Sequence, residues 1–334
     1  MIKYIFPALC LFSVYSCQNT QEAPDVSDIA ISPEVIRFEK ELFQGDTQNV
    51  EVLIERLSQK YPEFSDVFFQ QIIADPTFDN DVTRSTRFFV RDSFIRALYA
   101  DCDDLYQNFE PYTAEIEAGL KYFKYYFPDK PVPDIYTCIT GFEYGSFTVG
   151  DQILAIGLDF YLGSDYPNYH PDLFPVFIRQ TMSKEYLVAK SMQTLVNNYH
   201  GETRGNRLVD YIIHNGIGLY VKKKLLPFSS DAVIFEYSPD QLEWLEENES
   251  QIWGYFIEED LLLSSDYRSF QKIISPSPNV PGMPPDAPGQ LGNWIGERII
   301  ESYMDRHPET SLQTLLQLDD SQKILAESRY RPRQ

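Results

Sequence analysis

The chain has 334 residues, of which 43% are hydrophobic, so it can bury a substantial core in one large domain or two smaller ones. Its formal net charge is −22 with a pI near 4.5, which excludes nucleic acid as a partner because its phosphates would be repelled. The same charge argues against adhesion of the folded body to anionic lipid headgroups. The 23 Tyr and 23 Phe favour half-buried surfaces and grooves with a polar rim.

The first 16 residues predict a secretory signal. They hold one cation, an apolar run over residues 4–14, and small Ser16 directly before Cys17. This end resembles a bacterial lipobox, in which the cysteine is acylated and becomes the mature N-terminus, although Tyr15 is bulkier than usual there. The alternatives are a cleaved signal with Cys17 as an ordinary thiol, or an uncleaved anchor. The apolar run falls short of the about 20 residues that a membrane span needs.

We therefore divide the chain into a signal peptide (1–16), a lipidated cysteine with a flexible tether (17–33), and a single domain (34–334). The tether is predicted because residues 18–33 are polar and lack hydrophobic periodicity. No later stretch is apolar for long enough to cross a membrane, so membrane contact is expected to come from the acyl chains.

Hydrophobic spacings of three and four residues predict a helical N-terminal part. The expected helices span residues 34–61 (with a break at 44–46), 66–74, 79–99 and 111–127. The pattern then changes and predicts strands at 134–140, 146–149 and 152–156. Gly150-Asp151 is a plausible hairpin turn, so we expect a small antiparallel sheet followed by a loop over residues 157–169.

The longest predicted helix covers residues 174–197 and is apolar around much of its circumference, which places it at the centre of the fold. Further helices are expected at 208–225, 239–256, 292–304, 311–318 and 321–328. Ser238 is a typical N-cap with Pro239 after it, and six prolines exclude a helix over residues 275–289. Trp244 and Trp253 cannot share one helix face closely, so at least one should be core. The predicted class is α+β, mainly helical.

The order of these elements is found in zinc peptidases of the zincin type. In those enzymes His-Glu-x-x-His on the central helix presents two imidazoles on one face. Here Arg179 and Ser183 stand where the ligands would be, and neither can replace a neutral imidazole on Zn²⁺. We therefore predict a zincin-like domain with a degenerate metal site and no cofactor. The four histidines all lie off the predicted central helix: His170 and His200 in loops, His214 as a satisfied core residue, and His307.

Other catalytic patterns are missing as well. The sequence has no nucleophile elbow, no phosphate-binding Gly-Lys-Ser/Thr loop and no Cys-x-x-Cys. Asp79-Asn80-Asp81 resembles the start of a calcium loop, but Arg84 and Val90 stand where that loop needs Gly and Glu. The many carboxylates favour a solvated face, and no pair of them stands out as an acid and a base.

Two places remain as candidate functional regions. Charges on the apolar central helix are expected to pair or to face a groove, and the Pro-rich loop with the glycines after it can brace that groove or bind a partner. Close helix packing is the alternative for the glycines. The candidate groove or interaction residues are Arg179, Glu185, His214, Asn215, Gly292, Trp294 and Gly296.

Two cysteines remain if Cys10 leaves with the signal and Cys17 is acylated. An exported compartment permits a disulfide between Cys102 and Cys138. Two separate buried thiols are the alternative.

Several sequence pieces, in the same order along nearly the whole mature chain, resemble the gliding-motility lipoprotein GldB family of Bacteroidota. They are the lipobox, Gly157-Leu-Asp-Phe-Tyr-Leu-Gly163, Asn248-Glu249-Ser-Gln-Ile-Trp253, Pro288-Gly-Gln-Leu-Gly-Asn-Trp-Ile-Gly296, Ser302-Tyr-Met304 and Ile324-Leu-Ala-Glu-Ser-Arg-Tyr-Arg-Pro332. One departure is Ile213-His-Asn-Gly-Ile217, where the family pattern has Glu-Gly-Lys.

The resemblance implies a cell-envelope lipoprotein that is needed for gliding, linked to type IX secretion, without catalytic activity, and with a zincin-like fold that has lost its metal site. The expected partners are membrane lipid, through acylated Cys17, and other gliding or secretion envelope proteins. The expected location is the cell membrane or outer membrane, facing the periplasm. The alternatives are an envelope hydrolase that uses unrecognised carboxylates, and a lipoprotein that binds a glycan or peptide in a Tyr-rich groove.

Overall fold

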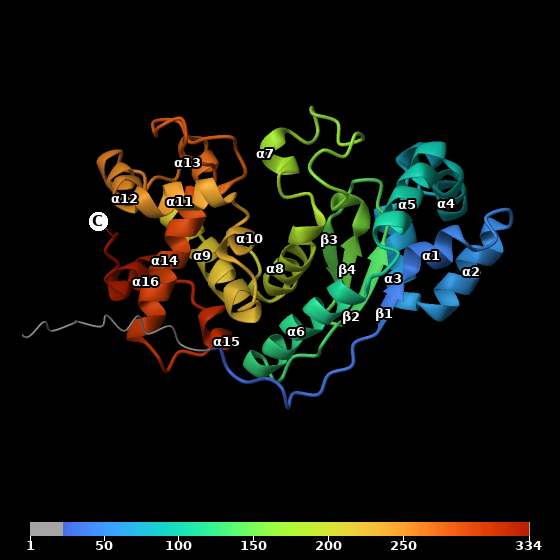
Figure 1. The fold of residues 1–334 in the computed structure, drawn as a ribbon, viewed down its shortest axis with the longest axis horizontal. Coiled ribbons are helices and arrows are strands. Elements are labelled where there is room, and N and C mark those ends of the chain that lie inside the picture. The colour runs from blue at the N-terminus through green and yellow to red at the C-terminus, as the bar shows by residue number, and fades with distance from the viewer. Residues whose placement is uncertain (1–22, 334) are drawn as a thin grey trace, which may run out of the picture.

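The computed structural model describes residues 23–333, so the predicted signal and Cys17 lie outside the described residues. The fold is mainly helical with a small four-stranded sheet (Figure 1), which confirms the predicted α+β, mainly helical class. The strands are β1 (Val35–Arg37), β2 (Asp134–Cys138), β3 (Ser146–Val149) and β4 (Ile153–Gly157), in the order β1-β2-β4-β3.

The sheet is mixed, so the prediction of a small antiparallel sheet is wrong. Strands β1, β2 and β4 run parallel, and β3 pairs antiparallel with β4. The predicted hairpin between β3 and β4 is confirmed, with Gly150 in its turn at a φ of +55°. Strand β4 is buried at every position, and its continuously apolar sequence is typical of a central parallel strand rather than of an alternating antiparallel one.

The N-terminal part differs from the prediction at two helix boundaries. Residues 35–37 form β1 instead of opening a helix, because they pair with β2. The predicted helix over residues 79–99 is broken at Asp92, whose carboxylate accepts from the backbone N–H groups of Phe94 and Ile95 and so caps a new helix. The helices are α1 (Phe38–Phe43), α2 (Val50–Lys60), α3 (Pro62–Val67), α4 (Val82–Arg91), α5 (Ser93–Leu105) and α6 (Glu110–Tyr126), with a π-helical turn at Phe68–Ile72 and a 3₁₀ turn at Pro76–Phe78.

The predicted central helix over residues 174–197 is also interrupted. A short helix α7 (Val176–Arg179) is separated from α8 (Leu187–His200) by Ser183, which is extended. The carbonyl of Met182 accepts from the backbone N–H of Gly163, 2.9 Å away, so a tertiary contact replaces the helical bond at this point. Short 3₁₀ turns cover Leu158–Phe160 and Lys184–Tyr186.

The C-terminal half consists of helices joined by loops, of which the Pro-rich segment over residues 275–290 is the longest. The predicted helices at 208–225 and 321–328 are confirmed, and the helix predicted at 292–304 is slightly longer. The predicted capping box at Ser238 and Gln241 is present, but that helix ends at Glu247 and a second one begins at Glu249. The helices are α9 (Leu208–Leu225), α10 (Asp231–Phe235), α11 (Pro239–Glu247), α12 (Glu249–Glu258), α13 (Tyr267–Ile274), α14 (Leu291–Arg306), α15 (Leu312–Leu315) and α16 (Ser321–Ser328).

Helix α8 joins the two halves of the fold. It packs against β3 and β4 on one side and against α9 on the other, and α14 lies against α9 in turn (Figure 1). Buried apolar side chains from Ile36 to Ile324 form one contiguous core, and Ile31, before the predicted domain boundary, also packs against it. None of the helices within residues 23–333 combines the length and apolar character needed to cross a bilayer.

Candidate functional site

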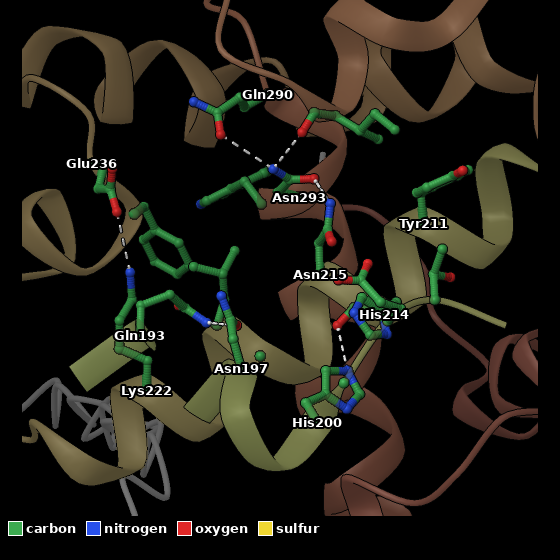
Figure 2. Close-up of a pocket in the computed structure, with 18 of the residues that line it drawn as sticks. Gln193, Asn197, His200, Tyr211, His214, Asn215, Lys222, Glu236, Gln290 and Asn293 are labelled. Carbon is green, nitrogen blue, oxygen red and sulfur yellow. Dashed lines mark hydrogen bonds and ion pairs between the residues drawn. The ribbon is translucent and has the colours of Figure 1, made fainter. Parts of the chain in front are cut away.

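A pocket of about 450 Å³ opens between α8, α9 and the start of α14 (Figure 2). Its walls come from α8 and the loop after it, from α9, from the end of α10 and the residues after it, from the end of α13 and from the start of α14. The lining residues are Gln193, Asn197, His200, Gly201, Glu202, Thr203, Tyr211, His214, Asn215, Gly218, Leu219, Lys222, Phe235, Glu236, Tyr237, Ile274, Gln290, Asn293 and Trp294.

Side-chain amides form the polar part of the wall. On α8, the amide of Gln193 donates to Asn197 Oδ1, 2.8 Å away. Across the pocket, Asn215 Nδ2 donates to Asn293 Oδ1 at 2.8 Å, and Asn293 Nδ2 donates to the carbonyl of Ile274 at 3.0 Å (Figure 2). These bonds fix the orientation of the amides, so each wall offers its remaining donors and acceptors in a defined direction.

Two histidines stack at one end of the pocket. The rings of His200 and His214 are 3.9 Å apart between centroids and nearly parallel. His200 is the last residue of α8, so its predicted place in a loop is wrong. Its ring nitrogens lie 3.1 Å from the carbonyls of Leu316 and His214. Burial lowers the pKa of both histidines, to about 4 for His214, where the neighbouring ring adds to the effect, so both are neutral at pH 7.

This arrangement bears on the metal question. A neutral imidazole has one N–H, so His200 donates to one of the two carbonyls while its second nitrogen lies 3.1 Å from the other carbonyl oxygen, and neither nitrogen faces an open coordination position. Within residues 23–333, no three His, Cys, Asp or Glu side chains cluster in a way that could hold a metal ion. Arg179 and Ser183 lie on α7 and in the extended link, not on a continuous central helix, so the argument that placed them at ligand positions loses its geometric basis.

An ion cluster around the buried Lys222 lies in another part of the pocket wall. Lys222 is 1% exposed and lies 3.6 Å from Glu236, which is also 3.1 Å from Lys190. Burial alone would raise the pKa of Glu236, but the two ammonium groups outweigh it and lower that pKa. Burial lowers the pKa of Lys222. The sequence did not reveal this cluster, because Lys222 in a Lys-Lys-Lys helix end is ordinarily read as a solvated cation.

Two buried polar atoms of the lining residues have no hydrogen-bond partner within residues 23–333. They are the indole Nε1 of Trp294 and Oε1 of Gln193. Trp294 is fully buried, with Arg298 4.9 Å from its ring centroid. Buried polar groups are satisfied in the great majority of cases, so an unpaired donor and an unpaired acceptor in one pocket wall require an explanation.

The structure separates the predicted groove residues into two groups. His214, Asn215 and Trp294 line the pocket, but Arg179 and Glu185 do not. The two glycines do not form an accessible patch. A Cβ on Gly296 would lie 2.0 Å from the carbonyl oxygen of Ile212, and one on Gly292 would lie 2.6 Å from Ile273. Both glycines are buried helix contacts, which favours the packing alternative for them.

The aromatic helix prediction also needs correction. Trp244 and Trp253 are both only half-buried, so neither is the core tryptophan that was expected. Trp253 packs edge-on against Tyr330, with ring centroids 5.2 Å apart. The hydroxyl of Tyr330 donates to the buried carboxylate of Glu249 at 2.7 Å. The Asn248–Trp253 piece therefore fastens the C-terminal segment to α12.

The Gly157–Gly163 piece also has a structural role. The carboxylate of Asp159 is fully buried and accepts from the backbone N–H groups of Thr140, at 3.0 Å, and Phe142, at 2.7 Å. Phe142 is held at a φ of +68°. Burial raises the pKa of Asp159 to about 6, although these hydrogen bonds oppose the shift. Asp159 thus fixes the loop between β2 and β3.

Cys102 and Cys138 are both buried free thiols, so the structure contains the two separate thiols and not the disulfide. Burial raises the pKa of both thiols, which keeps them protonated and unreactive at neutral pH.

Comparison with known proteins identifies the family. The family model for gliding motility protein GldB matches residues 19–332, nearly the whole chain after Cys17. No curated protein and no solved structure matches the chain, so the zincin-like fold remains a prediction. The chain therefore belongs to the GldB family of gliding motility lipoproteins.

Proposed function

We propose that this protein is a lipid-anchored, non-enzymatic component of the gliding machinery that works with type IX secretion in the cell envelope. The observation that carries the proposal is the family match over residues 19–332, which begins two positions after Cys17. Acylation of Cys17 supplies the anchor, and the folded body supplies contacts to other gliding or secretion proteins.

The geometry supports a non-enzymatic role. Groups that often carry catalysis have internal partners here: Asp159 accepts from two backbone N–H groups, and His200 faces two backbone carbonyls. Glu249 accepts from Tyr330. Removing any of these groups would disturb the structure, so each has a structural reason to be present.

The topology that we propose is an anchored body facing the periplasm. The residues after Cys17, Gln18-Asn19-Thr20-Gln21, lack Asp at the second mature position, so the sequence does not suggest retention in the inner membrane. They also lack a dense acidic run of the kind that we expect of surface-exported lipoproteins. Protease added to intact cells should therefore spare the protein until the outer membrane is permeabilised, and digestion in intact cells would contradict this topology.

The anchor is tested by Cys17→Ser, with Cys10→Ser as a matched control inside the predicted signal. We expect Cys17→Ser to lose acyl labelling, to leave the membrane fraction and to stop gliding, because the thiol is the attachment point. Cys10→Ser should be labelled and glide normally. An unlabelled wild type, or full membrane retention of Cys17→Ser, would refute the lipoprotein reading.

A further inference from the structure

The pocket between α8, α9 and α14 has the features of a ligand site that the proposed function does not use. Its volume of about 450 Å³ lies within the range of roughly 300–1,000 Å³ that is typical of small-molecule sites. Its walls are rich in side-chain amides, with aromatic side chains between them (Figure 2).

The unpaired atoms indicate that the ligand forms hydrogen bonds. Trp294 Nε1 is a donor and Gln193 Oε1 is an acceptor, and neither has a partner among the described residues. Leaving a buried donor or acceptor unpaired costs about 1–3 kcal/mol. Both atoms belong to residues that line the pocket but are themselves shielded from solvent, so a ligand with donors and acceptors reaches them after the lining side chains adjust.

The charges indicate that the ligand is neutral. Among the described residues that line the pocket, Lys222 is the single ammonium group, and it is paired with Glu236. His200 and His214 are neutral at pH 7, since burial lowers the pKa of each. Glu202 lies at the exposed rim, and the chain as a whole carries −22, so an anion would be repelled.

From these observations we propose that the pocket binds a neutral saccharide, as a monosaccharide or as the terminal unit of a glycan. A sugar hydroxyl is both a donor and an acceptor, and a side-chain amide offers the same pair of functions. Asn197, Asn215 and Gln290 supply amides in the same pocket, and Tyr211 and Phe235 supply apolar surface for the C–H face of a sugar ring.

Gly218 on α9 provides a way to fill the pocket, because it lines the pocket and has no side chain of its own. A Cβ at this position would lie 3.1 Å from Nε2 of Gln193, the flexible end of a side chain, so α9 can accommodate a substitution. A leucine there would extend into the ligand space. Gly254 on α12 is a matched control, because a Cβ on it would meet nothing within 4 Å.

The test is calorimetric titration of the intact lipoprotein, in a detergent without a sugar headgroup, with glucose, galactose, mannose, N-acetylglucosamine and their disaccharides. We expect at least one of them to bind with one-to-one stoichiometry. Gly218→Leu should weaken that binding at least tenfold, and Gly254→Leu should leave it unchanged. Gln193→Met removes the unpaired acceptor at constant length, together with the exposed hydrogen bond to Asn197, so it should weaken binding about tenfold with little change in the melting temperature.

Trp294 offers an independent readout. The sequence has three tryptophans, so the variant with Trp244→Phe and Trp253→Phe leaves Trp294 as the single indole reporter. Saccharide bound to its Nε1 should shift its emission. The proposal is overturned if no neutral saccharide binds, or if only charged sugars or short peptides bind. It is also overturned if the folded Gly218→Leu and Gln193→Met variants both bind as the wild type does.

Discussion

The contact between α9 and α14 allows a sharp stability prediction for Gly296→Ala. An ideal Cβ on Gly296 would lie 2.0 Å from the carbonyl oxygen of Ile212 and 3.1 Å from the Cα of Gly216. Ordinary van der Waals contact begins near 3.4 Å, so the two helices would have to separate by roughly 1 Å or more. The neighbouring atoms are backbone atoms, which cannot rotate away.

The magnitude follows from the size of this clash. Overpacking a core typically costs about 1–3 kcal/mol, occasionally more, and a clash with rigid backbone lies at the upper end. Alanine recovers about 1 kcal/mol through its better helix propensity. A net loss of about 2 kcal/mol corresponds to a melting temperature lower by roughly 3 °C for a chain of this size, and a larger loss to a proportionally larger shift.

Thermal unfolding followed by circular dichroism measures the effect. Gly254→Ala is the matched control, because its Cβ would meet nothing within 4 Å and it should melt at or slightly above the wild type. Gliding should fall only as far as the amount of folded protein falls. If Gly296→Ala melts as the wild type does, the close α9–α14 contact is wrong and the glycine is again available for a partner.

Three further predictions concern buried groups and the metal site. Asp159→Ala removes the acceptor for the N–H groups of Thr140 and Phe142, so denaturant unfolding should show a loss of about 3 kcal/mol; Asp172→Ala, an exposed carboxylate, should change the stability by less than about 0.5 kcal/mol. Burial raises the pKa of Glu297 to about 7. The cations Lys223 and Arg298 lower this pKa, whereas the carboxylates Glu301 and Asp231 raise it further. The folded state therefore holds this proton more tightly than the unfolded chain, whose glutamate pKa is about 4.3. Protonated Glu297 thus adds to the free energy of unfolding. This stabilisation is complete below about pH 4.3 and is lost as the pH rises through about 7. Melting curves of Glu297→Gln between pH 5 and pH 8 should lack that decline, which amounts to about 3 kcal/mol at most, and an unchanged slope would show that Glu297 is ionised in the fold. Elemental analysis of the purified protein should find no stoichiometric zinc, and a chelator should leave its melting temperature unchanged; one zinc per chain would contradict the degenerate-site reading.

Local signals explain which elements the sequence predicted correctly. Helix α9 matches its predicted limits, and the capping box at Ser238 is present, because hydrophobic period and capping chemistry act within a few residues. Strand β1 was missed because its pairing partner lies about a hundred residues away. The break at Ser183 was missed because the carbonyl of Met182 bonds to a distant loop. Neither contact has a local sequence signal.

The candidate site was predicted only in part for a similar reason. His214, Asn215 and Trp294 lie on helices whose limits were correct, and they do meet in the pocket. Gln193 and Lys222 were not singled out, because the approach of α8 to α9 and α14 is what turns ordinary helix residues into a polar wall. One buried and one half-buried lysine around a glutamate at a positive φ, as at Glu236, carry no sequence pattern that would reveal them.

The family-specific sequence pieces and the pocket have different roles in this molecule. Asp159 and Glu249 belong to such pieces, and both are buried and bonded to the chain itself, so neither can touch a partner. Gly296 is covered by α9. Trp294 differs, because it belongs to a family piece, lines the pocket and has a buried indole N–H without a partner among the described residues. If the family pieces take part in recognition directly, Trp294 is the position that both packs in the core and lines the pocket. Substitutions of the pocket residues around it should therefore weaken binding without unfolding the protein.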